Sequence, residues 1–247
     1  MCLIVFAWQP EHPQVLRLVA NRDEFYERPS AALSEWQEAR GVFAGCDLEA
    51  GGTWLGISAE GRFAALTNIR DPKQRAGLRS RGELSADYLC GQLGPKAYLE
   101  AVMARAASYG GFNLLLGDRS QLWHFNSHSG QARRLEAGVY GLGNADLDTP
   151  WPKLLRARQR LQDEPHADDQ RLLALMADTH RPADSELPDT GVGLAAERLL
   201  SSIFIASATY GTRASTVLKL GRDEQWSITE RSFGPHGAPL GEVALHG

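Results

Sequence analysis

The first 24 residues, MCLIVFAWQPEHPQVLRLVANRDE, decide the fold that we expect for this chain. Residues 3–8 are apolar and rich in strand formers, residues 9–13 have the prolines of a turn, and residues 15–20 are again strand-like. This pattern predicts a β-hairpin that ends in the charged run Asn21-Arg22-Asp23-Glu24. Because a hairpin folds its far end back onto its start, we expect these charges to lie beside Cys2.

Cys2 directly follows the initiator methionine. If Met1 is removed, Cys2 carries both a thiol and a free α-amine, with ordinary pKa values of about 8.5 and about 7.7–8.0. The amine can then act as the general base for its own thiol, which would make Cys2 an N-terminal nucleophile. The alternative is a buried thiol that packs like a small apolar side chain.

The charged run offers Cys2 two kinds of partner. A cation and a carboxylate beside the thiol and the amine can hold the amine in place and favour the thiolate, so Arg22 and Asp23 are candidate site residues. The alternative is a solvated strand end with an ordinary surface ion pair. The order of cysteine, hairpin and charge pair favours the first interpretation.

Composition limits the remaining classes of function. The chain has 247 residues, 43% of them apolar and 23% charged, which is typical of a globular protein. With a net charge of −4, it is not expected to bind nucleic acid or anionic membranes. It has no apolar run long enough to span a membrane and no signal-peptide pattern at its start, which predicts a cytoplasmic protein. Three cysteines, Cys2, Cys46 and Cys90, are too few and too unevenly spaced for a disulfide framework.

The order of predicted elements indicates an α+β fold, because strands and helices come in separate runs rather than alternating. We expect residues 1–247 to form a single domain with antiparallel sheets. The loop-rich segment 181–193 is a candidate lid or variable insertion, and the last ten residues are expected to be frayed or to lie at an edge. Strands are expected near residues 41–45, 50–57, 61–67, 112–116, 121–125, 138–142, 202–206, 213–220 and 225–231, and helices within 80–108, 153–161 and 169–177.

A few polar residues stand at the ends of predicted strands. Asn68 follows one strand, where an asparagine is either a turn former or a donor to an oxyanion. His124 and His128 have the spacing of a helical metal site, but they fall across a strand and a turn, so we expect no metal there. The sequence contains no Gly-rich phosphate loop, zinc-ligand spacing or Gly-x-Ser-x-Gly motif.

The run Asn21-Arg22-Asp23-Glu24 is the signature of the NRDE family, the transport and Golgi organisation 2-like proteins, and the chain resembles this family along nearly its whole length. The family resembles the N-terminal-nucleophile hydrolases of the choloylglycine and penicillin V acylase type, which implies a four-layer αββα sandwich. The matching blocks are Met1-Cys2, residues 21–29, Gly51-Gly52-Thr53-Trp54-Leu55-Gly56, Leu66-Thr67-Asn68, Gly141-Leu142-Gly143-Asn144, Thr149-Pro150-Trp151-Pro152-Lys153 and Tyr210-Gly211-Thr212-Arg213.

The resemblance also implies roles for individual residues. Cys2 would be the nucleophile, Asp23 would orient its amine and Arg22 would lie near its thiol, although these two charges are adjacent here and spaced apart in the acylases. The other implied catalytic residues are Asn144 and Asn68, which would hold the oxyanion, and Arg213, which would steady the nucleophile. The implied substrate-binding residues are Asn21, Trp54 and Thr67.

Three classes of function follow from the resemblance. The first is a cofactor-free hydrolase that cleaves a linear amide bond of a small acylated molecule. The second is a protein that binds or transports haem, acyl-CoA or lipid without cleaving it, in which a haem would depend on His124 or Cys2. The third is a scaffold, for which the sequence has no positive feature. The presence of all the residues expected of a nucleophile favours the hydrolase.

Overall fold

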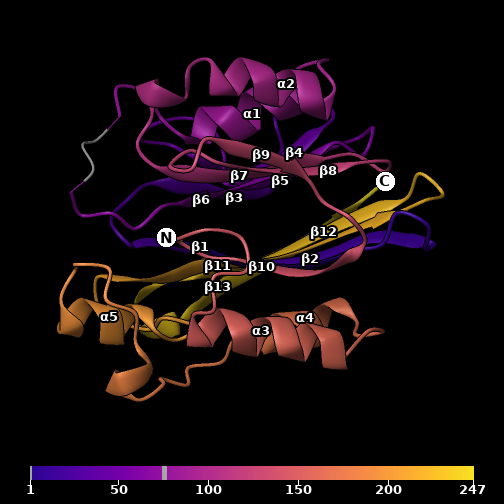
Figure 1. Ribbon diagram of the computed structural model, residues 1–247. Helices are drawn as coiled ribbons and strands as arrows, with labels where there is room; N and C mark the ends of the chain where they lie inside the picture. Colours follow the sequence, from indigo (N-terminus) through magenta and orange to yellow (C-terminus); the bar gives the residue numbers. More distant parts are fainter. Residues whose placement is uncertain (1, 74–76) are drawn as a thin grey trace.

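Two antiparallel β-sheets stack face to face, and helices cover the outer face of each (Figure 1). The computed structural model describes residues 2–73 and 77–247. This architecture confirms the predicted α+β fold and its four αββα layers. The six-stranded sheet has the spatial order β10 (Gly138–Leu142), β1 (Cys2–Trp8), β2 (Gln14–Phe25), β11 (Tyr210–Gly221), β12 (Trp226–Phe233), β13 (Pro239–His246).

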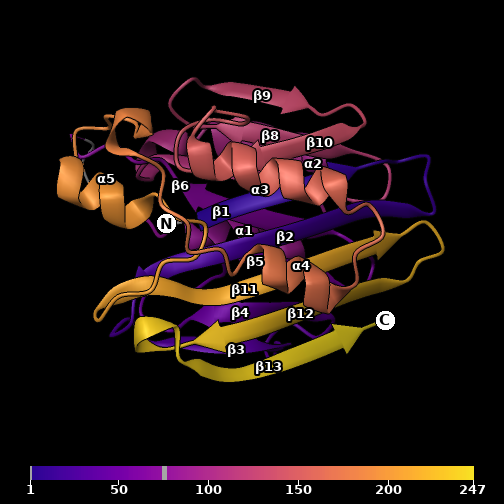
Figure 2. The same cartoon turned by 90° about the horizontal axis from the view of Figure 1, so that it is seen from below.

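The seven-stranded sheet follows the chain order of its strands from one edge to the other. Its strands are β3 (Ser30–Glu35), β4 (Val42–Asp47), β5 (Leu55–Ser58), β6 (Phe63–Asn68), β7 (Phe112–Gly117), β8 (Leu122–Asn126) and β9 (Gln131–Arg134). Helices α1 (Gly82–Cys90) and α2 (Pro95–Met103) cover this sheet, while α3 (Pro152–Asp163), α4 (Asp169–Leu175) and α5 (Leu194–Leu200) lie on the side of the six-stranded sheet (Figures 1 and 2). None of the helices in the described part of the chain is both long and apolar enough to cross a membrane.

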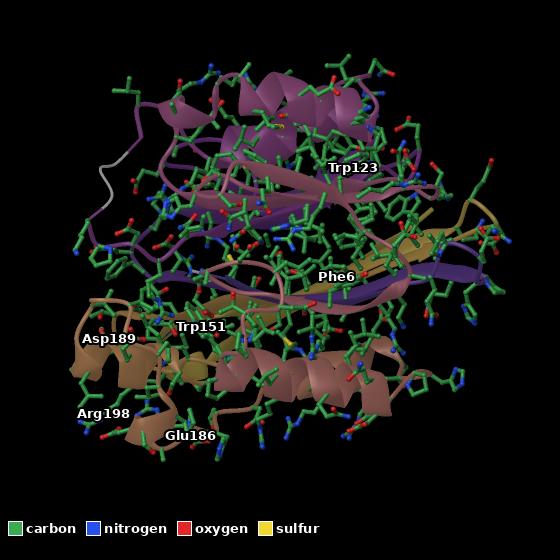
Figure 3. All side chains as sticks on the ribbon, in the orientation of Figure 1. Phe6, Trp123, Trp151, Glu186, Asp189 and Arg198 are labelled. Atoms are coloured by element: carbon green, nitrogen blue, oxygen red, sulfur yellow. The ribbon has the colours of Figure 1, made fainter. Side chains whose placement is uncertain are left out.

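Strand β1 is buried on both faces because its side chains alternate between two apolar layers. Ile4 and Phe6 belong to the core between the sheets, and Figure 3 shows Phe6 there. Leu3 and Val5 pack instead against α3. The side chains of β2 alternate in the same way, so neighbouring residues of the charged run point into different layers.

Helix α3 packs closely on the six-stranded sheet because glycine stands at the point of contact. A Cβ atom on Gly141 of β10 would clash with the side chain of Leu154 in α3. Figure 2 shows α3 lying across the strands of this sheet. The close packing brings the first turn of α3 against the end of the sheet where Cys2 lies.

The charged run lies inside β2 rather than at the end of a strand, so the predicted boundary at residue 20 is wrong. Strand β2 continues to Phe25 because β11 pairs with it that far, although β1 pairs with it only up to Arg22. Cys2 of β1 lies opposite Arg22, and Thr212 of β11 lies opposite Asp23. The expected closeness of these charges to Cys2 is confirmed by the first of these pairings.

The other differences concern weakly marked elements. Strands β3 and β9 were not predicted from the sequence, and they are the two polar edges of the seven-stranded sheet. The expected strand at 202–206 is a buried irregular segment, in which Phe204 N–H donates to Asp178 O instead of to a strand. The chain end forms β13, which lies at an edge as expected.

Candidate active site

A cavity of about 460 Å³ lies at the end of the molecule where Cys2 begins β1. Cys2, Arg22 and Glu24 line it from the six-stranded sheet, and Trp54 and Asn68 line it from the β4–β6 region of the other sheet. Residues just before α1, including Arg81, complete the wall. The cavity therefore brings together five residues that the sequence predicts for the site, namely Cys2, Arg22, Asp23, Trp54 and Asn68.

Cys2 is half-buried, and burial raises the pKa of its thiol. Arg22 lowers the pKa of the thiol, as expected of a neighbouring cation, but Asp23 raises it and desolvation outweighs the cation. A thiol with a raised pKa needs a base to take its proton before it can attack a carbonyl. This requirement agrees with a role for the α-amine.

Arg22 faces the cavity and is held by an aromatic ring and a carboxylate. Its guanidinium carbon lies 4.2 Å from the centre of the Trp54 ring, and Nη2 lies 3.7 Å from Asp47 Oδ2. Asp47 in turn accepts a hydrogen bond of 2.7 Å from Arg28 Nε. Gly45 makes room for the Trp54 ring, because a Cβ atom there would overlap it. Arg22 is thus fixed near the thiol with its charge only partly balanced.

Asp23 and Asn21 point away from Arg22, toward the helices. Asp23 Oδ1 accepts a hydrogen bond of 2.8 Å from Thr212 Oγ1, and burial raises the pKa of the carboxyl. Asn21 is fully buried and donates to the carbonyls of Met176 and Ile203, at 2.9 and 2.8 Å. Asn21 does not line the cavity, so its contacts are those of a residue that fastens the sheet to the helical layer and not those of a substrate contact.

Asn68 and Asn144 meet where the two sheets come together. Asn144 Nδ2 donates to Asn68 O at 2.9 Å, and Arg70 N–H donates to Asn144 O at 2.7 Å. Asn68 lines the cavity, whereas Asn144 is fully buried directly behind it. Asn144 Oδ1 has no hydrogen-bond partner among the described residues. The pair joins the ends of β6 and β10, and Asn144 Oδ1 can still accept a hydrogen bond.

Beneath this junction lies a set of neutral polar side chains that we call the amide cluster: Thr67, Asn113, His124 and Asn126. Thr67 Oγ1 donates to Gly143 O at 2.7 Å, while Asn113 Nδ2 and Asn126 Nδ2 each donate to Ala145 O at 3.0 Å. These bonds hold the loop that carries Asn144. Thr67 is thus buried and outside the cavity lining, where it supports the loop instead of a substrate.

His124 is sealed inside the amide cluster. It has no exposed surface, its Nε2 lies 3.1 Å from Asn113 Oδ1, and burial lowers its pKa to about 4. It does not line the cavity, so it does not fit the expected role of a haem ligand. Sequence reasoning did not single out Asn113 and Asn126, because asparagines inside strands carry no recognisable motif.

Arg213 lies in a β-bulge between Thr212 and Ala214, where β11 has one residue more than β2. Such a bulge redirects a side chain. Its guanidinium donates to the carbonyls of Phe25 and Arg28, at 2.9 and 2.6 Å, and to Ser30 Oγ at 3.1 Å. These contacts fix the connection from β2 to β3. Arg213 therefore supports the strand that carries Arg22 and does not line the cavity.

A second buried set, which we call the charged cluster, lies between the six-stranded sheet and the helices: Asp23, Arg70, Lys153 and Glu197. Arg70 Nη1 and Glu197 Oε2 form an ion pair of 2.6 Å, and Arg70 also lies over the ring of Trp151, which Figure 3 shows near the start of α3. Lys153 was only part of a matched block in the sequence, where nothing distinguished it from a surface lysine.

The comparisons with solved structures define the class. The chain superposes on a Caenorhabditis elegans N-acylethanolamine-hydrolyzing acid amidase orthologue with a TM-score of 0.51 and 10% identity, covering 88% of this chain and 92% of that one. It also superposes on a conjugated bile acid hydrolase from Clostridium perfringens, solved as a mutant lacking its second-residue cysteine, with a TM-score of 0.54 and 8% identity, covering 99% and 92%. At such identities the likeness shows the fold alone, and that fold is the one of the N-terminal-nucleophile hydrolases.

Sequence comparison then identifies the family. The chain belongs to the family Transport and Golgi organisation 2, which matches residues 1–235. The Transport and Golgi organization protein 2 homolog of Bos taurus is 35% identical over 94% of this chain and 93% of its own length. The homolog of Mus musculus is 33% identical over the same shares, and the protein of Drosophila melanogaster is 28% identical over 96% and 95%.

Proposed function

We propose that this chain is a cysteine amidohydrolase that cleaves a linear C–N amide bond of a small acylated molecule. The observation that carries the proposal is the position of Cys2: it begins β1 opposite Arg22, lines a cavity of about 460 Å³, and stands next to a buried carboxyl. Two proteins with the same fold are, by name, an acid amidase and a conjugated bile acid hydrolase, and the second was solved as a mutant in which alanine replaces the second-residue cysteine.

The reaction begins with removal of Met1, which frees the α-amine of Cys2. The amine takes the proton of Sγ, Sγ bonds to the carbonyl carbon, and the carbonyl electrons move onto oxygen. Asn68, at the cavity wall, is the amide donor for this oxyanion, and Asn144, buried behind the wall, donates to Asn68 O and holds Asn68 in place. Asp23 orients the amine, and Arg22 stabilises negative charge as it develops near sulfur.

The second half of the reaction returns Cys2 to its starting state. Collapse of the tetrahedral adduct breaks the C–N bond, and the leaving amine takes the proton that the ammonium of Cys2 holds. An acyl thioester remains. Water attacks it and gives its proton to the α-amine, and the C–S bond then breaks, so that Sγ recovers the proton and the acid leaves. No cofactor enters this scheme.

The first test needs no substrate. Intact-mass spectrometry shows whether Met1 is present, and brief iodoacetamide treatment with peptide mapping compares Cys2 with Cys46 and Cys90 in the same molecule. We expect a chain without Met1 in which Cys2 is alkylated at least ten times faster than the other two. Cys46→Ser and Cys90→Ser variants serve as matched controls and should leave the Cys2 rate unchanged. A retained Met1, or an inert Cys2, would contradict the proposal.

That contradicting outcome would favour the non-catalytic alternative, and haem and acyl-CoA titrations would then follow. With a reactive Cys2, a panel of N-acyl amides varied in acyl length and in amine identifies the substrate. Among the described lining residues, Cys2 is the sole cysteine and none is a histidine, so a haem would have to bind through the same thiol. Competition between haem and iodoacetamide therefore separates the two functions.

A further inference from the structure

Lys153 is a buried side chain that the scheme above does not use. It stands in the first turn of α3 and is only 5% exposed. Its Nζ has no hydrogen-bond partner among the described residues, and within that part of the chain it forms no ion pair shorter than 4.0 Å. An ammonium group in this state has lost its hydration without a direct replacement, which is costly. Burial accordingly lowers the pKa of Lys153 to about 8.

The groups around Lys153 come from four other parts of the chain. Asp23 of β2 acts on it most strongly, followed by Arg70 after β6, Cys2 of β1 and Glu197 of α5. A cavity of about 10 Å³, the size of one water molecule, is lined by Lys153, Arg70 and Glu197. Lys153 is therefore a buried cation that shares a cavity with Arg70 and Glu197 and lies within electrostatic range of the carboxyl of Asp23.

The formal charges of the charged cluster sum to zero without the α-amine of Cys2. Arg70 and Glu197 form an ion pair of 2.6 Å with side chains only 5% and 4% exposed, and Thr190 Oγ1 also donates to Glu197. Those two charges neutralise each other, and the positive charge of Lys153 balances the carboxylate of Asp23. A protonated α-amine on Cys2 would add an uncompensated positive charge to a buried region, which is unfavourable.

We propose that Lys153 is a positioning residue that neutralises the carboxylate of Asp23. The α-amine of Cys2 then stays neutral and is able to accept the thiol proton. This inference rests on the proposed function. A free α-amine is about half protonated near pH 7.7–8.0, so a neighbouring cation is needed to make it a base at neutral pH. Lysine next to another amine is a recognised way of activating one of the two.

The test follows the alkylation rate of Cys2 against pH in protein that lacks Met1. In Lys153→Met the pKa of both the amine and the thiol should rise, because removing a cation stabilises the ammonium form of the amine and destabilises the thiolate. We expect the midpoint of the profile to move up by about one pH unit. Lys153→Arg should restore the original midpoint to within a few tenths of a unit, which a merely structural role would not require.

A matched control and a variant of opposite sign complete the design. Arg156→Met removes a cation from the same helix that pairs with Asp178, at 2.6 Å, and should leave the midpoint unchanged. Glu197→Gln releases the charge of Arg70 and should move the midpoint to lower pH, which tests the inference even if Lys153→Met does not fold. Circular dichroism and thermal unfolding establish which variants are folded.

The outcomes separate this inference from the function on which it rests. A Cys2 that is alkylated no faster than Cys46 and Cys90 in the parent chain overturns the proposed function and this role of Lys153 together. A fast Cys2 whose midpoint does not move in folded Lys153→Met overturns the role of Lys153 alone. Shifts of the same sign in Lys153→Met and Glu197→Gln also overturn it.

Discussion

The charged cluster and the amide cluster lie on either side of the junction that holds Asn68 and Asn144, and they treat polar groups in opposite ways. The amide cluster is neutral, and its hydroxyl and amide groups hydrogen-bond one another and the loop above them, while His124 Nδ1 has no hydrogen-bond partner among the described residues. The charged cluster has formal charges, one tight ion pair and an ammonium without a direct partner among the described residues.

From this contrast we infer that the amide cluster stabilises the fold, whereas the charged cluster serves the chemistry of Cys2. Buried polar groups that satisfy one another fix a single geometry and gain nothing from changing their protonation. Buried charges that are only partly satisfied have shifted pKa values, and such groups gather where protons are moved. The amide cluster should therefore respond to mutation with lost stability, and the surroundings of Cys2 with lost reactivity. The predictions below test that division.

The largest effect is expected from Cys2→Ala. Without the thiol no thioester forms, so turnover of any amide that the parent chain cleaves should fall to background. The fold should persist, with a melting temperature within about 2 °C of the parent, because Cys2 is a small residue at the start of a strand. Turnover and thermal unfolding measured on the same preparation check both statements, and Cys46→Ser is the control. Full activity in Cys2→Ala would remove the nucleophile from the mechanism.

Asn144→Ala should lower kcat by up to about 10²–10³, the typical loss when one oxyanion donor fails, because Asn68 loses the hydrogen bond that holds it in place. KM should change little, because the side chain lies behind the cavity wall and not in it. Steady-state kinetics on the cleaved amide gives both quantities. If KM rises sharply while kcat is kept, Asn144 binds the substrate, and the division between the clusters has to be redrawn.

Acid should weaken the amide cluster through His124. Its pKa is about 4 in the folded protein and 6.5 when unfolded, so between these values the unfolded chain binds more protons and stability falls as the pH falls. The loss from pH 6.5 to pH 4 amounts to about 3 kcal/mol. Urea unfolding at several pH values measures it. His124→Gln should flatten this part of the curve; an unchanged slope would mean that another group titrates.

The smallest effect is expected from Asn113→Ala, which removes the hydrogen bonds that Asn113 forms within the amide cluster and with the loop above it. Asn113 donates to Thr67 and to Ala145 O, and accepts from Asn126. Stability should fall by about 2 kcal/mol, because buried partners are left unsatisfied. The alkylation rate of Cys2 should stay within about twofold of the parent. A large fall in that rate would mean that the amide cluster also controls the nucleophile.

Two runs of apolar, strand-forming residues on either side of a turn predicted the part of the fold that holds Cys2. A strand pattern followed by a turn and a second strand was enough to place Arg22 beside Cys2, because pairing in a hairpin is local. The layers of the sandwich came from the resemblance of the whole chain to a family. The weak points were β3 and β9, where polar edge strands lack a buried face and leave little periodicity to recognise.

Side-chain direction limited what could be predicted about the site. Asn21 and Arg22 are neighbours in one motif, yet one fastens the helical layer and the other faces the cavity. Only the burial of both faces of β2 explains this difference. Lys153 could not be recognised either, because its importance depends on burial beside a carboxyl 130 positions earlier in the chain. The cytoplasmic location stays a prediction.

Strand β2 acquires its second neighbour late in synthesis. Thr212, which donates to Asp23, lies 189 positions further along the chain. At about 5–20 residues per second, a ribosome needs about 10–40 s to cover that distance. Throughout this interval β1 and β2 exist without the strand that completes their sheet, and the chain terminus is open to an aminopeptidase. The order of synthesis thus leaves time, before the site closes, for the removal of Met1 that the proposed mechanism requires.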